Sequence, residues 1–335
     1  MQAHTKLGDK LKRRCITLPF LAGAVVIGLV LAPLWWAWAL SFDLLAKQYR
    51  KRPRVRGVCA AQLYILSEFA GVLMAGILWL FTAGGIAVGE TRWVALNGTL
   101  QRWWTGTLFA GMVWIYGLRV EVEGLEEARR GPYLLFIRHT SMLDTVVAAA
   151  LIANPHRILF RYVLKKELLS DPCLDIVGCR LPNAFIDRKA RASDSEIGAI
   201  RGLTQGIEST SGILIYPEGT RFSRKKLERA RTRLREKGLH ELAERADALT
   251  HVLPPRLAGS TALMMAAPDL DVVIVEHKGF EAASSPARLW RGDLVGQTIR
   301  VRIRRFEAPQ LAEGEHADWL YTRWEEVNAW VKDAS

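Results

Sequence analysis

Residues 133 to 144 read Tyr-Leu-Leu-Phe-Ile-Arg-His-Thr-Ser-Met-Leu-Asp, and this stretch decides the fold of the chain. Tyr133 to Arg138 is short and apolar, which predicts a buried strand. The alanine-rich run from Thr145 to Ala153 predicts a helix directly after it. A histidine, His139, therefore lies where a strand ends, and a carboxylate, Asp144, lies at the start of the next helix. In α/β folds the carboxyl ends of parallel strands carry the chemistry, so both residues are candidate catalytic groups.

The spacing of His139 and Asp144 suits an acid–base pair. On one helix, residues five positions apart lie about 140° apart and do not touch. With the histidine in the preceding turn, its ring can fold back onto the carboxylate, which the helix N-terminus keeps ionised. Such a carboxylate selects one imidazole tautomer and makes the other ring nitrogen a better base. A histidine that only caps the helix or fills the loop is the alternative.

Beyond residue 118 the pattern alternates between strands and helices. Strands are expected at 157–164, 183–187, 212–216, 272–277 and 299–306, and helices at 194–208, 224–249 and 259–267. This predicts an α/β domain at 119–335, with a mixed, largely parallel sheet flanked by helices. Residues 224–249 form a basic helical insert, interrupted at Gly238. The insert either lies on anionic lipid or packs on the domain as a solvated helix.

Residues 1–118 are predicted to form a membrane anchor of two or three apolar helices or hairpins. Apolar runs occupy 15–46, 58–89 and 103–118, and a bilayer span needs about 20 apolar residues. Lysines and arginines precede the first run and fill the loop at 47–56, so both flanks have cytoplasmic character. A hairpin that enters and leaves on one side, or a monotopic anchor, therefore stays open beside true spans. The remainder is expected to face the cytoplasm, at a bacterial inner or endoplasmic-reticulum-type membrane.

Composition limits the class of partner. The 335 residues include 46 Lys and Arg against 34 Asp and Glu, a formal net charge of +12. This charge favours an anionic partner, which can be a membrane surface, a phosphorylated substrate or nucleic acid. The chain has no recognised nucleic-acid module. Its four cysteines lack metal-like or disulfide-like spacing, and no ligand set accompanies His139, so no metal is expected.

Three further stretches follow predicted strands: Phe185-Ile186-Asp187-Arg188, Tyr216-Pro217-Glu218-Gly219-Thr220-Arg221, and Val252-Leu253-Pro254-Pro255-Arg256. Arg188 and Arg221 carry guanidinium forks that suit phosphate oxygens. Gly219 permits close approach of the backbone to a ligand, and Glu218 can accept a hydrogen bond from a hydroxyl or hold an arginine. Taken singly, Gly-Thr-Arg after a strand is usually a turn, and Asp187-Arg188 is usually a surface ion pair.

In this order and together, the stretches resemble the glycerophospholipid acyltransferase family, typified by 1-acylglycerol-3-phosphate acyltransferases. The resemblance runs from about Val120 to Val275. Two positions depart from the family pattern: Arg138 stands where asparagine is common, and Ser260 stands where phenylalanine often follows the glycine. We interpret Arg138 as a change in how the substrate is held, with the chemistry retained.

The resemblance implies acyl transfer to a lysophospholipid, above all 1-acylglycerol-3-phosphate giving phosphatidic acid. His139 would take the proton of the acceptor hydroxyl and Asp144 would orient the ring. The donor would be acyl-CoA or acyl carrier protein, with membrane lipids as further partners, no other cofactor, and the oligomeric state open. Other acceptors, including glycerol-3-phosphate, and a non-catalytic anionic-lipid binder are the alternatives. The residues expected to bind the acceptor are Arg188, Glu218, Gly219, Thr220 and Arg221.

Overall fold

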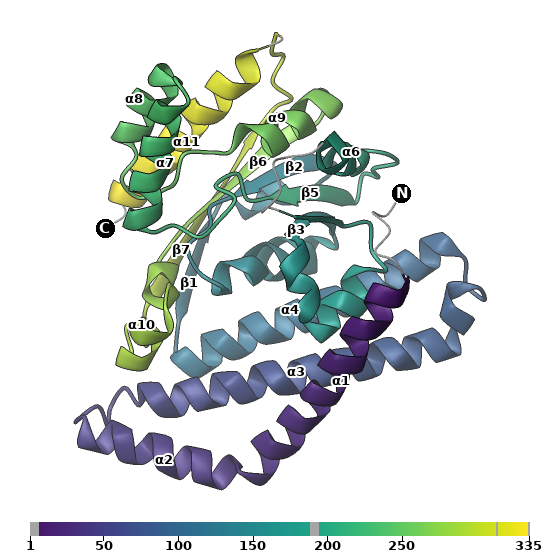
Figure 1. Cartoon of the computed structure of the whole chain (residues 1–335), viewed down its shortest axis with the longest axis vertical. Coiled ribbons are helices and arrows are strands. Elements are labelled where there is room, and N and C mark those ends of the chain that lie inside the picture. Colours follow the sequence, from purple (N-terminus) through teal and green to yellow (C-terminus); the bar gives the residue numbers. More distant parts are fainter. Residues whose placement is uncertain (1–6, 188–193, 313, 334–335) are drawn as a thin grey trace.

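The computed structural model describes residues 7–187, 194–312 and 314–333, and its centre is a seven-stranded sheet (Figure 1). The strand order is β1-β7-β6-β2-β5-β3-β4. The strands are β1 (Arg119–Glu123), β2 (Tyr133–Ile137), β3 (Leu159–Lys165), β4 (Ala184–Ile186), β5 (Ser211–Ile215), β6 (Asp271–Lys278) and β7 (Thr298–Phe306). The sequence predicted six of these strands; β1 is the additional one.

Strand β2 is central and runs parallel to both neighbours. Leu135 lies opposite Leu214 of β5 and Val273 of β6, and all five β2 residues are buried. Strands β3 and β4 continue the parallel set beyond β5, whereas β7 runs antiparallel to β6 and pairs in parallel with β1. The carboxyl ends of β2, β5 and β6 therefore meet at one edge, where His139 and Glu218 emerge. The predicted mixed, largely parallel sheet is confirmed.

Helices cover both faces of the sheet. One face packs on α6 (Asp194–Gly202), α9 (Leu257–Ala266) and α11 (Glu315–Asp333), and Trp324 of α11 is fully buried there. The other face packs on the helical segment 143–156, which contains η3 (Leu143–Val146) and α5 (Asn154–His156), and on α4 (Glu90–Tyr116). The insert forms two helices, α7 (Arg224–Glu236) and α8 (His240–Ala248), that pack on each other and meet near Gly238, where φ is +70°.

The N-terminal region consists of α1 (Leu7–Val30), α2 (Ala32–Leu45), α3 (Pro53–Phe81) and α4. Among the described residues, α1 and α3 are long and apolar enough to cross a membrane. The third apolar run was predicted at 103–118, but it is the second half of the 27-residue helix α4. Helix α4 lies between α3 and the sheet (Figure 1), and its Ile115 and Tyr116 join the core of the α/β domain.

Candidate active site

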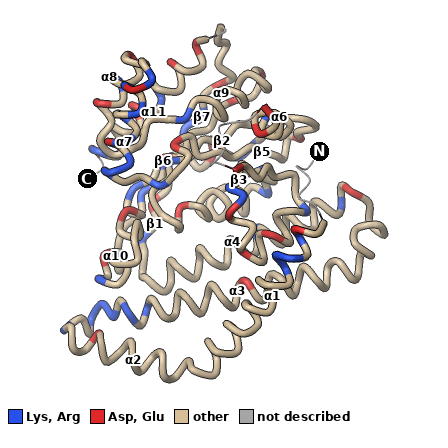
Figure 2. Tube along the Cα trace, viewed as in Figure 1, with Lys and Arg blue, Asp and Glu red and all other residues tan. Residues whose placement is uncertain are grey.

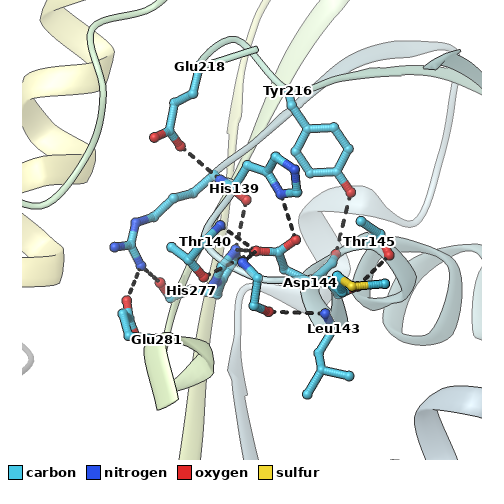
Figure 3. A network of polar contacts seen from close by, with 12 residues as sticks. His139, Thr140, Leu143, Asp144, Thr145, Tyr216, Glu218, His277 and Glu281 are labelled. Atoms are coloured by element: carbon cyan, nitrogen blue, oxygen red, sulfur yellow. Dashed lines mark hydrogen bonds and ion pairs between the residues drawn. The ribbon is translucent and has the colours of Figure 1, made fainter. Parts of the chain in front are cut away.

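His139 and Asp144 form a hydrogen-bonded pair at the carboxyl end of β2 (Figure 3). Nδ1 of His139 lies 2.8 Å from Oδ1 of Asp144. The carboxylate is fully buried, whereas 12 % of the histidine side chain is exposed. The contact predicted from the sequence is present. Because Asp144 engages Nδ1, the opposite nitrogen, Nε2, is the one that can exchange a proton with a substrate.

The loop between β2 and η3 holds the Asp144 carboxylate in its charged form. Oδ2 accepts the backbone amides of Thr140 at 2.5 Å and Ser141 at 2.7 Å, and the Thr140 hydroxyl at 3.1 Å. Burial by itself raises the pKa of Asp144, but the hydrogen bond and charge of His139, the charge of His277 and the Ser141 amide outweigh it. The pKa is therefore below its ordinary value, and the carboxylate stays ionised beside the imidazole.

Two buried rings complete the surroundings of the pair. The imidazole of His139 lies 4.5 Å, centroid to centroid, from Tyr216 at the end of β5. Nε2 of His277, at the end of β6, lies 3.6 Å from Oδ2 of Asp144 and 2.8 Å from the carbonyl oxygen of Arg138. A carbonyl oxygen can only accept, so Nε2 of His277 donates this hydrogen bond, and burial lowers the pKa of His277 against the raising effect of Asp144. No role for His277 was expected from the sequence; its only signal was its position at the end of a predicted strand.

Arg138 points into the protein, away from solvent, and is 1 % exposed. Its guanidinium donates to the backbone carbonyls of His277 at 2.6 Å and His251 at 2.8 Å, and to Glu281 Oε1 at 2.5 Å. It therefore ties the end of β2 to the end of β6 and to the loop at residue 251. The prediction that Arg138 changes how the substrate is held does not fit this position, because the side chain is buried and both of its terminal nitrogens donate to protein groups.

Glu218 occupies the end of β5 as a buried backbone acceptor, with 1 % of the residue exposed. One carboxylate oxygen accepts the amide of His139 and the other accepts the amide of Leu253, each at 2.8 Å. Burial raises its pKa to about 7, against the lowering effects of Arg138 and the two amides. We expected Glu218 to contact the acceptor. The geometry corrects this expectation, because both oxygens already hold the loops that carry His139 and Leu253.

Three basic side chains, Arg221, Lys226 and Arg256, lie close to the turn at Gly219. The glycine has φ +69°, and a Cβ built there would lie 2.6 Å from Cδ of Arg256. Nζ of Lys226 donates to the Thr220 hydroxyl at 3.0 Å and to the Arg221 carbonyl at 2.8 Å. Partial burial and the neighbouring charges of Arg221 and Arg256 lower the pKa of Lys226, although Glu218 opposes them. The turn therefore carries positive charge suited to an anionic group, and Lys226 and Arg256 were not among the predicted site residues.

Arg188, the remaining predicted acceptor-binding residue, lies outside the described residues. Its neighbour Asp187 is described, and the Asp187 amide donates to Glu196 Oε1 of α6 at 2.8 Å. Strand β4, which precedes it, is the edge strand beyond β3.

Comparisons with known proteins give one family match. Residues 119–258, from β1 to the start of α9, match the family model described as Acyltransferase. A search of curated proteins finds no match. Among solved structures, the chain is similar to the 1-acyl-sn-glycerophosphate (LPA) acyltransferase, PlsC, from Thermotoga maritima. The identity is 14 % and the TM-score 0.43, over 78 % of this chain and 96 % of that chain.

Proposed function

We propose that this chain is a glycerophospholipid acyltransferase that transfers a fatty acyl group from a thioester to the free hydroxyl of a lysophospholipid, because residues 119–258 match the Acyltransferase family model. The preferred acceptor in this proposal is 1-acylglycerol-3-phosphate, and the product is phosphatidic acid. The observation that carries the proposal is the 2.8 Å contact between His139 and an ionised, buried Asp144. That pair is the arrangement expected of a general base that activates an alcohol.

In the proposed reaction, Nε2 of His139 removes the proton of the acceptor hydroxyl as its oxygen attacks the thioester carbon. The C–O bond forms, the C–S bond breaks, and the thiolate leaves with the proton from the imidazolium. Asp144 stabilises the imidazolium by its negative charge while the proton resides there. The two substrates react directly, so much of the rate enhancement comes from holding them side by side. No acyl-enzyme is required.

The cations around Gly219 support an acceptor that carries a phosphate. Arg221 is exposed, Lys226 is partly exposed, and both lie beside the turn that follows β5. Charge-assisted hydrogen bonds from guanidinium and ammonium groups are strong ligands for phosphate oxygens. We assign Arg221 and Lys226 to the acceptor phosphate, and assign Glu218 to support of the loops around His139.

The N-terminal helices support a membrane-bound enzyme whose anchor lies in one leaflet. At the middle of α3, Glu68 accepts the amide of Cys173 at 3.0 Å, and Tyr64 donates to Asp171 at 2.7 Å. If α3 crossed the bilayer, these contacts would carry a charged loop of the catalytic domain to the hydrocarbon midplane, which is costly. An anchor that lies along the membrane surface avoids this cost and keeps the site close to lipid substrates.

The experiment that tests the proposal supplies purified protein with radiolabelled acyl-CoA and a panel of acceptors. The panel contains 1-acylglycerol-3-phosphate, glycerol-3-phosphate and lysophospholipids with other head groups. Labelled phosphatidic acid should form with wild type and be lost in His139→Ala. Transfer only to glycerol-3-phosphate would select that alternative, and product formation that survives His139→Ala would remove the base. Vesicle binding without transfer to any acceptor would favour the non-catalytic binder.

A further inference from the structure

Helix α7 of the insert begins at the catalytic loop. The backbone amide of Phe222, two residues before the helix, donates to the carbonyl oxygen of His139 at 2.8 Å. The side chain of Ser223 then caps the helix by accepting the backbone amide of Lys226. Thirteen residues at 1.5 Å each make α7 about 20 Å long. The helix therefore starts beside the catalytic loop and extends away from it.

One side of α7 is lined by cations. Arg229, Arg233 and Lys237 follow Lys226 at steps of three, four and four residues, so all four lie on one side of the helix. Lys226, at the inner end, reaches the acceptor turn through the hydroxyl of Thr220. The other three are exposed, and within the described part of the chain none of them forms an ion pair. We name Arg229, Arg233 and Lys237 the cationic track.

The remaining residues of α7 show what holds the helix in place. Arg231 and Arg235 both pair with Asp247 of α8. Leu227 is buried against the domain. By contrast, like charges four residues apart on a helix repel each other, and cations in the first turn oppose the helix dipole. The cationic track therefore lowers the stability of α7, and a bound anion would relieve the repulsion.

The sheet separates the cationic track from the N-terminal anchor. Leu227 of α7 joins the core on the sheet face that α6, α9 and α11 cover. The anchor lies on the other face, where α4 packs on the sheet and α3 packs on α4. Figure 2 shows lysines and arginines along α7, at the end of the molecule opposite α2 and α3. The anion that suits the track is therefore one that arrives from water.

The position of the track suits one of the two substrates. In 1-acylglycerol-3-phosphate the free hydroxyl and the phosphate are carried by adjacent carbon atoms. Its phosphate must therefore bind close to His139, as proposed for Arg221 and Lys226. In an acyl-CoA or an acyl carrier protein, the whole pantetheine arm separates the thioester from the phosphate. Cations that bind this phosphate must lie well away from the base, as those of the outer part of α7 do.

We propose that the cationic track binds the phosphate end of the acyl donor, while the pantetheine arm lies along α7 and brings the thioester to His139. This inference rests on the proposed function and adds a donor site to it, distinct from the acceptor turn. The phosphate belongs either to CoA, which carries a pyrophosphate and a ribose phosphate, or to the phosphodiester of a carrier protein. In both cases guanidinium and ammonium groups donate charge-assisted hydrogen bonds to phosphate oxygens.

The test compares the full-length wild type with a track variant that combines Arg229→Gln, Arg233→Gln and Lys237→Gln. Glutamine has a high helix propensity, so α7 is retained. A matched control removes three exposed charges elsewhere, through Arg92→Gln, Arg129→Gln and Arg130→Gln. Three donors with the same acyl chain are supplied: acyl-CoA, an acyl carrier protein, and acyl-pantetheine, which lacks phosphate.

The track variant should have a KM for a phosphate-bearing donor that is raised about tenfold, because each exposed cation contributes about two- to threefold in affinity. Its KM for acyl-pantetheine and for the acceptor should stay unchanged, and the control should match wild type throughout. Added salt should raise the wild-type KM for the phosphate-bearing donor and have less effect on the track variant. Whichever of the two phosphate-bearing donors responds identifies the source of the phosphate.

Three outcomes would overturn the donor site. An equal rise in the KM for acyl-pantetheine would show that the loss does not depend on phosphate. Constants that are unaltered with all three donors would leave the track without a role in donor binding. Weaker binding of the track variant to anionic vesicles, with an unaltered KM for the donor, would assign the cations to lipid.

Direct binding separates this inference from the proposed function. Calorimetric titration with CoA, and with a carrier protein that bears an unacylated pantetheine arm, requires no acyl transfer. Wild type should bind at least one of them, and the track variant should bind it about tenfold more weakly, even if no acceptor is acylated. If transfer proceeds and the track variant binds both with wild-type affinity, the donor site is refuted and the enzyme proposal stands.

Discussion

Replacing Asp144 with asparagine changes one atom of the His139–Asp144 pair and forces the imidazole into the wrong tautomer. In the wild type, Oδ2 accepts two backbone amides at 2.5 and 2.7 Å, and Oδ1 faces Nδ1 of His139 at 2.8 Å. The asparagine oxygen must take the Oδ2 position, because an NH₂ there would face two N–H donors. The NH₂ then points at Nδ1, which must become an acceptor, so the ring proton moves to Nε2.

An imidazole that already carries its proton on Nε2 cannot accept one from the acceptor hydroxyl. We therefore expect the turnover number to fall by roughly a hundredfold to ten-thousandfold, which is the usual contribution of a positioned general base. The KM values for both substrates should stay nearly constant, since neither side chain is assigned to ground-state binding. The ¹⁵N chemical shifts of the His139 ring measure the tautomer directly, and thermal melting checks that the variant is folded.

Thr140→Ala is the matched control. It removes only the 3.1 Å hydroxyl contact to Oδ2 and leaves the carboxylate charged. Its turnover number should remain within a few-fold of wild type. A folded Asp144→Asn variant with nearly unaltered turnover would refute the dyad. A large loss in turnover with an unchanged His139 tautomer would refute the tautomer shift as the cause of the loss.

Three other changes probe the turn after β5. Arg221→Ala should raise the KM for a phosphate-bearing acceptor by about tenfold or more, because a hydrogen bond to a charged group contributes about 1.5–3 kcal/mol; an equal loss with a phosphate-free acceptor would remove this role. Burial raises the pKa of Glu218 from 4.5 to about 7. Its contribution to the free energy of unfolding is therefore fully present below pH 4.5 and is lost as the pH rises through about 7. Glu218→Gln should therefore flatten the dependence of Tm on pH in this window, and a wild-type Tm that does not fall there would contradict the shift. Gly219→Ala places a Cβ against Arg256 at positive φ. It should cost about 1–2 kcal/mol of stability and raise the acceptor KM by displacing the turn that carries Arg221, whereas an unchanged KM would show that the turn does not bind the acceptor.

Local sequence pattern was sufficient to predict much of the fold and the central pair of the site. The buried run at residues 133–137, followed by a turn and an alanine-rich segment, predicted a strand that ends shortly before His139. The partner of His139 lies only five residues away, so the geometry of one turn brings the two side chains together. Gly238 interrupted the helical pattern of the insert at the position where α7 and α8 separate. In each case the relevant interaction is formed by residues close in sequence.

The remaining contacts of the site depend on the order of the strands in the sheet, and no local sequence pattern encodes that order. His277 meets Asp144, and Arg138 spans to Glu281, only because β6 lies directly beside β2. Glu218 was expected to face the substrate, but the neighbouring position of β5 gives each of its oxygens a backbone amide to accept. The contact of Trp290 with α2 likewise joins residues some 250 positions apart, at 5.5 Å. A side chain's partners across a sheet depend on which strands become neighbours, and long-range packing of the whole chain determines that.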